Sequence, residues 1–284
     1  MTGFSAEWLA LREPYDRRAR NAAALDAVAA AFAGAPSIAI VDLACGAGAT
    51  LRAVSSHLPR RQSWRLVDND RGLLVRAAEA ARAAEVEAMP LMVDLARDLD
   101  RALVEPVDLV TISALLDLVS VEWLDRLATA IAARALPIYA ALTYDGRVEF
   151  EPVDEFDAGV IEAVNQHQRG DKGFGPALGP TAAVEAITRL EALGYAIVQG
   201  VSDWTFGALD RAIQSELIAG WAAAAHESDS LTRAGVEGWL ARRLNHVASG
   251  RSSVRVGHVD VFARPIRARR AAKSQSNNNS PSSG

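Results

Sequence analysis

Asp42 lies just before a turn of small residues, and the two features together restrict the kind of ligand that the turn could bind. The apolar run 38–43 leads into the turn, which reads Leu-Ala-Cys-Gly-Ala-Gly-Ala, and a segment with helical spacing follows. A strand, a glycine turn and a helix in this order are typical of sites for nucleotide-like cofactors. The dinucleotide fingerprint G-x-G-x-x-G requires a small third residue, but Gly46 and Gly48 place Leu51 at that position. Because a carboxylate at Asp42 would repel a pyrophosphate and attract an amino or sulfonium group, the sequence disfavours a dinucleotide.

Two further carboxylates follow segments that have the pattern of strands. Asp68 ends the second such segment, and Asp94 follows the third. A carboxylate after the second strand can accept hydrogen bonds from both hydroxyls of a ribose. Either residue could instead cap a helix, Asp68 the one near Asp70 and Asp94 the one after Leu95. Three carboxylates at the ends of three successive strands favour a cofactor that contains a nucleoside.

Strand and helix patterns alternate through the chain. The predicted strands are 38–43, 63–68, 87–93, 107–112, 136–143, 195–204 and 252–265. Helical spacing between the first five strands is found at 50–58, 71–84, 97–104 and 115–134. Five strand–helix units in a row predict an α/β fold with a doubly wound, seven-stranded, mostly parallel sheet. The carboxyl ends of parallel strands meet at one edge, so we expect the three carboxylates to lie there together.

Composition separates three parts of the chain. They are an N-terminal helical arm at 1–34, a main domain at 35–264 with helical cap insertions near 145–180 and 207–250, and a tail at 265–284. In the arm, Pro14 suits the first position of a helix and disfavours helix at Glu13, so we expect a break between two helices there. The tail is basic at first and then polar without any apolar residue, and we expect it to be disordered.

The overall composition indicates a soluble, cytoplasmic protein. The 284 residues carry a net charge of −5, whereas a nucleic-acid-binding protein normally has a basic surplus. No signal peptide and no apolar run long enough to span a membrane is found, and Cys45 as the only cysteine excludes an intrachain disulfide. The histidines are scattered, so no metal site is expected. The oligomeric state stays open.

The segment VDLACGAGA, residues 41–49, resembles motif I of the class I S-adenosylmethionine-dependent methyltransferases, D/E-x-G-x-G-x-G, with Ala44 where the family more often has glycine. The segment after the fourth predicted strand and the last predicted strand also resemble motifs of this family, so the resemblance extends over roughly residues 8–264. It implies a Rossmann-like methyltransferase fold and S-adenosylmethionine as the cofactor. The binding residues that it implies are Asp42, Ala44, Cys45, Gly46 and Gly48 for the methionine portion, Asp68 and Asn69 for the ribose, Asp94 and Leu95 for the adenine, and Ser113 in the fourth motif. The Cys45 side chain itself is expected to be a buried filler and not a nucleophile.

Residues around the predicted sheet are candidates for contacts with the carboxylate of the cofactor and with the acceptor. Arg20 or Arg12 could pair with the carboxylate, or could form salt bridges with Asp16 along one helix face. Asp117 and His167 are the candidate general bases; alternatively, Asp117 caps a helix and His167 faces the solvent. The candidate substrate-binding residues are Tyr144, His167, Arg169 and Lys172.

The predicted function is the transfer of a methyl group from S-adenosylmethionine to an oxygen or nitrogen of a small polar metabolite. Two alternatives remain at this stage. One is a protein that binds S-adenosylmethionine without catalysis, and the other, which Asp42 disfavours, is a nicotinamide-dependent oxidoreductase.

Overall fold

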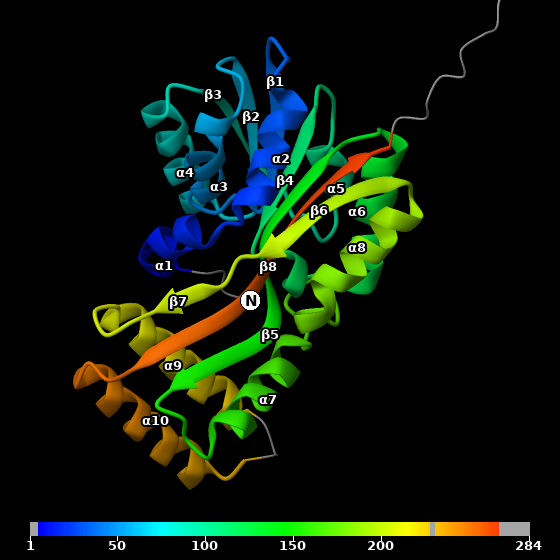
Figure 1. The fold of residues 1–284 in the computed structure, drawn as a ribbon. Helices are drawn as coiled ribbons and strands as arrows, with labels where there is room; N and C mark the ends of the chain where they lie inside the picture. Colours follow the sequence, from blue (N-terminus) through cyan, green and yellow to red (C-terminus); the bar gives the residue numbers. More distant parts are fainter. Residues whose placement is uncertain (1–4, 228–230, 267–284) are drawn as a thin grey trace, which may run out of the picture.

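The computed structural model of the chain describes residues 5–227 and 231–266 and contains an eight-stranded sheet with helices on both faces (Figure 1). The strands are β1 Ile38–Leu43, β2 Gln62–Asp68, β3 Glu87–Met92, β4 Leu109–Ser113, β5 Ile138–Glu151, β6 Tyr195–Val201, β7 Trp204–Phe206 and β8 Ser253–Pro265. Their order is β3-β2-β1-β4-β5-β8-β6, and β7 pairs with the first part of β8. The pairs among β1 to β5 are parallel, whereas β8 is antiparallel to its partners. Beyond Ile266, the predicted tail lies outside the described residues.

Helices pack on the two faces of this sheet. They are α1 Ala6–Ala19, α2 Ala22–Phe32, α3 Ala49–Val54, α4 Arg71–Ala83, α5 Leu99–Ala102, α6 Val121–Ala133, α7 Asp157–Gln168, α8 Ala182–Ala192, α9 Arg211–His226 and α10 Arg233–Ala248, with short 3-10 turns at η1 Ser55–His57, η2 Leu116–Leu118 and η3 Gly179–Thr181. Side chains of α2, α3 and α4 share a core with Ile40 and Trp64, while α5, α6 and α8 share another with Val41 and Val67. Alternate residues of β1 therefore face opposite layers, and the predicted doubly wound α/β fold is confirmed.

The described sheet has one strand more than predicted because the segment 195–204 is divided. β6 ends at Val201, the Ser202 N–H bonds to the His258 carbonyl oxygen, and β7 begins at Trp204. As a result, β6 pairs with the second part of β8, from Val259 to Pro265, and β7 pairs with its first part, from Val254 to Val256.

β5 is longer than predicted and continues past Thr143 into the segment that the sequence pattern places in a cap insertion. Its second half alternates, with Val148 and Phe150 packed into the core and Arg147 and Glu149 facing outwards. This alternation is the pattern of a half-buried strand, but the acidic residues around it obscure the signal.

The predicted break at Glu13 is wrong, because α1 runs without interruption through Pro14. A proline in a helix interior costs about 3 kcal/mol through the lost hydrogen bond and its ring clash. Tertiary contacts of the same turn offset this cost: Glu13 pairs with Arg52 of α3, and Asp16 is buried against β7. The chain breaks instead at Arg20, which is extended between α1 and α2.

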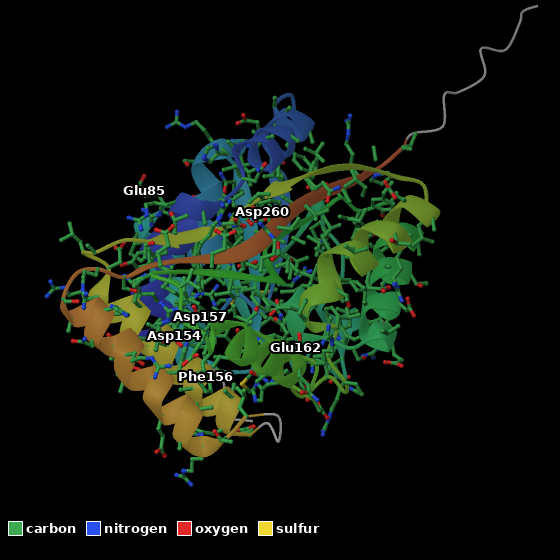
Figure 2. All side chains as sticks on the ribbon, turned by 60° about the horizontal axis from the view of Figure 1, so that its bottom comes forward. Glu85, Asp154, Phe156, Asp157, Glu162 and Asp260 are labelled. Atoms are coloured by element: carbon green, nitrogen blue, oxygen red, sulfur yellow. The ribbon has the colours of Figure 1, made fainter. Side chains whose placement is uncertain are left out.

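α7, α9 and α10 pack on the second half of β5, on β7 and on the first part of β8, and we call this part of the molecule the cap (Figure 1). It has its own apolar core, which includes Phe150 and Trp239. Figure 2 labels Asp154, Phe156 and Asp157, which precede or open α7, near α10.

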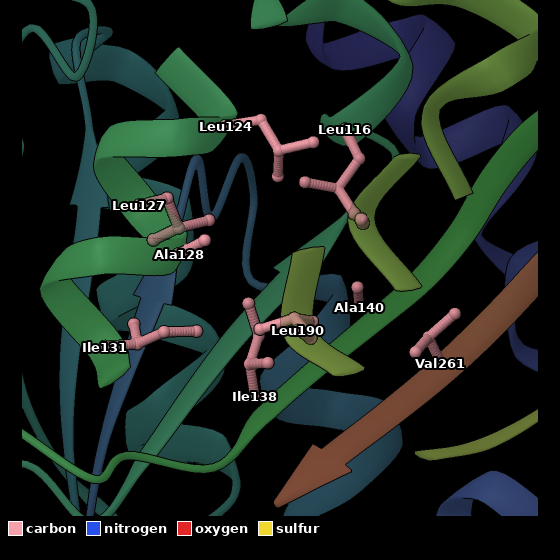
Figure 3. A pocket seen from close by; sticks show the side chains of 10 residues that line it. Leu116, Leu124, Leu127, Ala128, Ile131, Ile138, Ala140, Leu190 and Val261 are labelled. Atoms are coloured by element: carbon pink, nitrogen blue, oxygen red, sulfur yellow. The ribbon is translucent and has the colours of Figure 1, made fainter. Parts of the chain in front are cut away.

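A small apolar cavity lies in the core between α6, α8 and the sheet (Figure 3). Leucine, isoleucine, alanine and valine side chains line its volume of about 10 Å³. A water molecule needs at least this much space together with polar partners, so the cavity is a packing defect and not a ligand site.

Candidate active site at the carboxyl edge of the sheet

The glycine turn between β1 and α3 contains three residues with positive φ, and one of them is alanine. The φ angles are +53° at Ala44, +52° at Gly46 and +85° at Gly48. A Cβ on Gly46 would lie 3.4 Å from the Leu9 side chain of α1, and one on Gly48 would lie 3.2 Å from Ala77 of α4. The glycines therefore allow both the backbone conformation and the close approach of two helices.

Asp42 is fully buried at the end of β1 and is only half satisfied. Its Oδ1 accepts a hydrogen bond of 2.7 Å from the Thr111 hydroxyl, whereas its Oδ2 has no partner among the described residues. Burial raises the pKa of Asp42 to about 7, against the effects of the Thr111 hydrogen bond and of the positive charge of Arg20. A buried carboxylate oxygen without a donor is costly, and a ligand that supplies a donor would remove this cost.

Arg20 is the arginine whose positive charge acts on Asp42. Its guanidinium donates over 3.4 Å to the Tyr139 hydroxyl and over 3.3 Å to Ser113 Oγ at the end of β4. Its Nε is buried without a partner among the described residues. Arg12 forms the i,i+4 salt bridge with Asp16, at 2.9 Å, which agrees with the helix-face alternative for this arginine.

Asp68 connects the end of β2 to the glycine turn. One carboxylate oxygen accepts the Gly46 N–H at 2.9 Å, and the other accepts the Asp70 N–H at 3.0 Å. Burial raises the pKa of Asp68 above its ordinary value, although these backbone hydrogen bonds act in the opposite direction. The helix-capping alternative for Asp68 is wrong, since Asp70 itself caps α4. Asn69, also predicted at this site, is exposed beside them.

The two residues predicted at the adenine differ in exposure. Asp94 is exposed after β3, and its carboxylate accepts the Ala96 N–H within a turn. The helix-capping alternative for Asp94 is wrong, because α5 begins only at Leu99, with Asp98 at its N-cap position. Leu95 contradicts its predicted role beside the adenine ring, because its side chain is buried in the core of α5 and α6. Its carbonyl oxygen accepts the Trp123 indole N–H at 2.7 Å.

Asp117 forms a second unsatisfied carboxylate, beyond β4. It is buried, and its Oδ1 has no partner among the described residues. Burial raises the pKa of Asp117 to about 6, against backbone hydrogen bonds and the charge of Arg12. The capping alternative is wrong here as well, because Ser120 caps α6. Tyr144, whose hydroxyl donates to Asn165 at 2.8 Å, supplies one of the backbone groups near Asp117.

No pattern in the sequence marks the residues that surround Arg12. The Trp204 ring contacts both the Arg12 guanidinium, 4.8 Å from the ring centroid, and the His258 ring, at 4.7 Å between centroids. The Trp204 indole donates to Asp16 at 3.0 Å. Burial, together with the charge of Arg12, lowers the pKa of His258 to about 3, so this imidazole is neutral at neutral pH. His258 also contacts the Tyr144 ring, at 6.0 Å between centroids.

The polar residues predicted from the end of α7 and the loop after it are not brought to this edge by the contacts that the structure describes. His167 lies 3.3 Å from Glu227 and 3.3 Å from Lys172, and it is part of a surface cluster of the cap. Burial lowers the pKa of Lys172. Arg169 is exposed, and its side chain packs near Gly179. The predicted roles of these three residues as base or substrate ligands are therefore not supported.

α1 covers the glycine turn and is held there by an ion pair. Arg52 of α3 donates to both carboxylate oxygens of Glu13, over 2.5 and 2.6 Å, and also to the Ala47 carbonyl oxygen of the turn at 2.8 Å. In Figure 1, α1 lies below the carboxyl ends of β1 and β2. The helix thus shields the buried charges of Asp42 and Arg20 from solvent.

Cys45 agrees with its predicted role as filler, because it is buried and burial raises the pKa of its thiol. Within residues 5–227 and 231–266, no cluster of metal-ligating side chains is found. The helices described there include none with the length and apolar character that a bilayer crossing requires.

A groove of about 770 Å³ lies at the opposite, amino edge of the sheet, between the starts of β4 and β5 and the end of β8. Asp108, Pro137 and Ile266 are among the residues that line it. None of the lining residues has a buried polar atom without a partner, in contrast to Asp42 and Arg20.

Comparisons with known proteins agree with this architecture. No family model and no curated protein matches the chain. A cyclopropane-fatty-acyl-phospholipid synthase-like protein from Lactobacillus casei superimposes with a TM-score of 0.54 and 13% identity, over 92% of this chain and 94% of that chain. The chain has a class I methyltransferase fold.

Two other solved structures are more distant. The cyclopropane synthase MmaA2 from Mycobacterium tuberculosis has a TM-score of 0.47 and 12% identity, over 92% of this chain and 95% of that chain. A SAM-dependent methyltransferase from Thiobacillus denitrificans, in complex with S-adenosyl-L-homocysteine, has a TM-score of 0.44 and 15% identity, over 93% of this chain and 100% of that chain. At these identities the similarity concerns the fold alone.

Proposed function

We propose that the chain is an S-adenosylmethionine-dependent methyltransferase that acts on an oxygen or nitrogen of a small polar metabolite. One observation carries the proposal. Asp42 Oδ2, Arg20 Nε and Asp117 Oδ1 are buried at the same edge of the sheet, and none has a partner in the described part of the chain. Unpaired buried groups of opposite charge, next to a glycine turn, are what a ligand with both an ammonium and a carboxylate would satisfy.

The residues present fit this cofactor. The unpaired Asp42 oxygen would hold its ammonium, Arg20 Nε its carboxylate, and the free lone pairs of Asp68 its ribose hydroxyls. Asp94 is accessible to an adenine amino group. When bound, the cofactor supplies a methyl group already activated by a sulfonium.

The chain itself would then orient the acceptor, exclude water and manage one proton. α1 and its Glu13–Arg52 pair exclude water above the glycine turn. With a pKa of about 6, Asp117 is mostly ionised at neutral pH and can take the proton of a hydroxyl or an ammonium. The neutral His258 contacts the Tyr144 ring, and the Tyr144 backbone lies near Asp117. A polar acceptor with a hydrogen-bond donor is what an unpaired carboxylate oxygen selects.

Thermal unfolding with S-adenosylmethionine, S-adenosylhomocysteine and NAD, each in excess, tests the proposal. A ligand at 100 times its dissociation constant adds about 2.7 kcal/mol to the stability of the folded state, a clearly visible shift. We expect a shift with the first two ligands that is lost in Asp68→Ala. Asp108→Ala is the matched control, because Asp108 also accepts a backbone N–H, at 2.8 Å, but at the opposite edge of the sheet. A shift with NAD alone would refute the proposal.

A further inference from the structure

Asp260 of β8 is a fully buried carboxylate that no expectation from the sequence included (Figure 2). It accepts three hydrogen bonds: from the Asn21 N–H at 3.0 Å, from the Tyr139 hydroxyl at 2.9 Å and from the Leu142 N–H at 2.8 Å. Leu142 has a φ of +55° and lies where the pairing of β5 with β8 is irregular, next to Ala140 and Thr143. One carboxylate thus joins the arm, β5 and β8.

The Tyr139 hydroxyl links Asp260 to Arg20 through two hydrogen bonds. Burial raises the pKa of Tyr139 above its ordinary value, so the hydroxyl keeps its proton. It donates that proton to Asp260 and accepts from the Arg20 guanidinium at 3.4 Å, while the guanidinium carbon lies 5.8 Å from the centre of the ring. The direction of both hydrogen bonds is fixed, because a guanidinium cannot accept, so the Tyr139 oxygen accepts from Arg20 and its single proton is donated to Asp260.

Asp260 also holds the backbone next to Arg20. Asn21 follows Arg20 directly, caps α2 through Ala24, and donates its side-chain amide to the Val201 carbonyl oxygen at 3.1 Å. Gly200 makes room for this contact, since a Cβ there would lie 2.2 Å from the Asn21 amide. The junction between α1 and α2 is therefore fixed on β6 and β8.

We propose that Asp260 is a positioning residue that acts through Tyr139 and Asn21 to hold Arg20 for the carboxylate of an amino-acid-bearing nucleoside ligand. The inference rests on the proposed function. It explains why Arg20 keeps a buried, unpaired Nε instead of turning to a partner: its other two nitrogens are tied to Tyr139 and Ser113. Arg20 is thereby preorganised before the ligand arrives.

Binding of two probes to Tyr139→Phe tests this role. S-adenosylhomocysteine carries the carboxylate, whereas 5′-methylthioadenosine has the same nucleoside without the amino-acid portion. We expect the dissociation constant of the first, measured by calorimetry, to rise about tenfold, as for loss of one hydrogen bond to a charged group, and that of the second to change less than about twofold. Tyr195→Phe is the matched control, because it removes the hydroxyl of another buried tyrosine, which donates to the Leu136 carbonyl oxygen.

A double-mutant cycle identifies the route of the effect. If Tyr139 acts through Arg20, Tyr139→Phe has no further effect on S-adenosylhomocysteine binding once Arg20→Ala is present. Asp260→Asn should weaken the same probe at least as much as Tyr139→Phe. Equal weakening of both probes in Tyr139→Phe, or additive effects in the cycle, would overturn the positioning role while leaving the proposed function intact. Failure of the unmodified chain to bind S-adenosylhomocysteine would overturn both.

Discussion

The cap and the carboxyl edge of the sheet both bury charged side chains, but they differ in whether all polar atoms of these side chains have hydrogen-bond partners. In the cap, Asp157 accepts from Trp239 at 2.8 Å, from the Asp154 N–H at 2.8 Å and from Arg243 through two nitrogens. The third nitrogen of Arg243 donates to the Pro152 carbonyl oxygen at 2.6 Å. Every polar atom of this pair has a partner. At the carboxyl edge, Asp42 and Arg20 each keep an unpaired buried atom.

This difference separates a structural ion pair from a ligand site. A network whose members satisfy one another has no use for a ligand, and removing one member is destabilising. A network with unpaired atoms is itself destabilising until something binds. Backbone strain also differs between the two regions: Ala44, Ala114 and Leu142 have positive φ at the carboxyl edge, whereas no non-glycine residue of the described cap does. Glu85 and Ala135, which follow α4 and α6, have positive φ away from both regions. Strain of this kind is common at functional sites.

Removing one partner of the cap pair should give the largest effect on stability. Arg243→Met leaves the Asp157 carboxylate buried without its cation, and we expect the free energy of unfolding to fall by about 3–5 kcal/mol in urea titrations. Binding of S-adenosylhomocysteine to the remaining folded protein should stay within about twofold. A loss of stability below about 1 kcal/mol would show that the cap pair does not differ from a surface ion pair.

Asp42→Asn should change stability in the opposite direction and in a pH-dependent way. Since the pKa of Asp42 is raised from 3.8 to about 7 on folding, the folded state binds the proton more tightly than the unfolded chain, and stability falls as pH rises from about 4 to about 7. The difference in unfolding free energy between the variant and the unmodified chain should therefore shift in favour of the variant by about 3 kcal/mol from pH 4.5 to pH 8, at 1.36 kcal/mol per pKa unit.

Two comparisons sharpen the Asp42 measurement. Saturating S-adenosylhomocysteine should reduce the pH slope of the unmodified chain, because its ammonium stabilises the ionised carboxylate. Asp108→Asn, at the exposed amino edge, should leave the slope unchanged. If the free energy of unfolding depended on pH in the same way in Asp42→Asn and in the unmodified chain, ionising the buried Asp42 carboxyl would carry no cost in stability.

The contrast between the two regions also explains what the sequence could reveal. The strands around the glycine turn have strong local signals, so the amino-acid sequence by itself predicts Asp42 and Asp68 at one edge of the sheet. α9 and α10 also lie within the helical cap insertion predicted near 207–250. These features depend on periodicity and turn chemistry, which neighbouring residues determine.

The remaining features depend on contacts between distant parts of the chain. The Tyr139–Asp260 hydrogen bond joins residues 121 positions apart, and the Asn21–Asp260 bond joins residues 239 positions apart. No local pattern marks such pairs. The break expected at Glu13, before Pro14, is absent for the same reason, because tertiary contacts override a local preference. The prediction for Leu95 is wrong because a motif specifies a position in the chain and not which way its side chain turns.

A smaller effect is expected when the helix over the site is loosened. Glu13→Gln breaks the two-bond ion pair with Arg52, whose side chains are 19% and 28% exposed, and should weaken S-adenosylhomocysteine binding by about fivefold, or roughly 1 kcal/mol. The change should appear as faster dissociation in stopped-flow experiments, because α1 covers the turn. Arg242→Met removes a similar pair with Asp154 in the cap and is the control. Equal dissociation rates of S-adenosylhomocysteine from Glu13→Gln and from the unmodified chain would show that the Glu13–Arg52 pair of α1 does not help to retain the ligand.

The smallest effect concerns the strain at Ala44. The left-handed conformation costs alanine about 1–2 kcal/mol, whereas glycine adopts it freely but loses about 0.4–1 kcal/mol through the greater freedom of the unfolded chain. Ala44→Gly should therefore stabilise the protein by about 0.5 kcal/mol. Ala47→Gly in the same turn is the control, since Ala47 has no positive φ and should lose about 0.5–1 kcal/mol. If both variants lose stability equally, packing of the Ala44 methyl group outweighs the strain of its backbone. The positive φ at Ala44 would then carry no net cost in free energy, and the carboxyl edge would not differ from the cap in this respect.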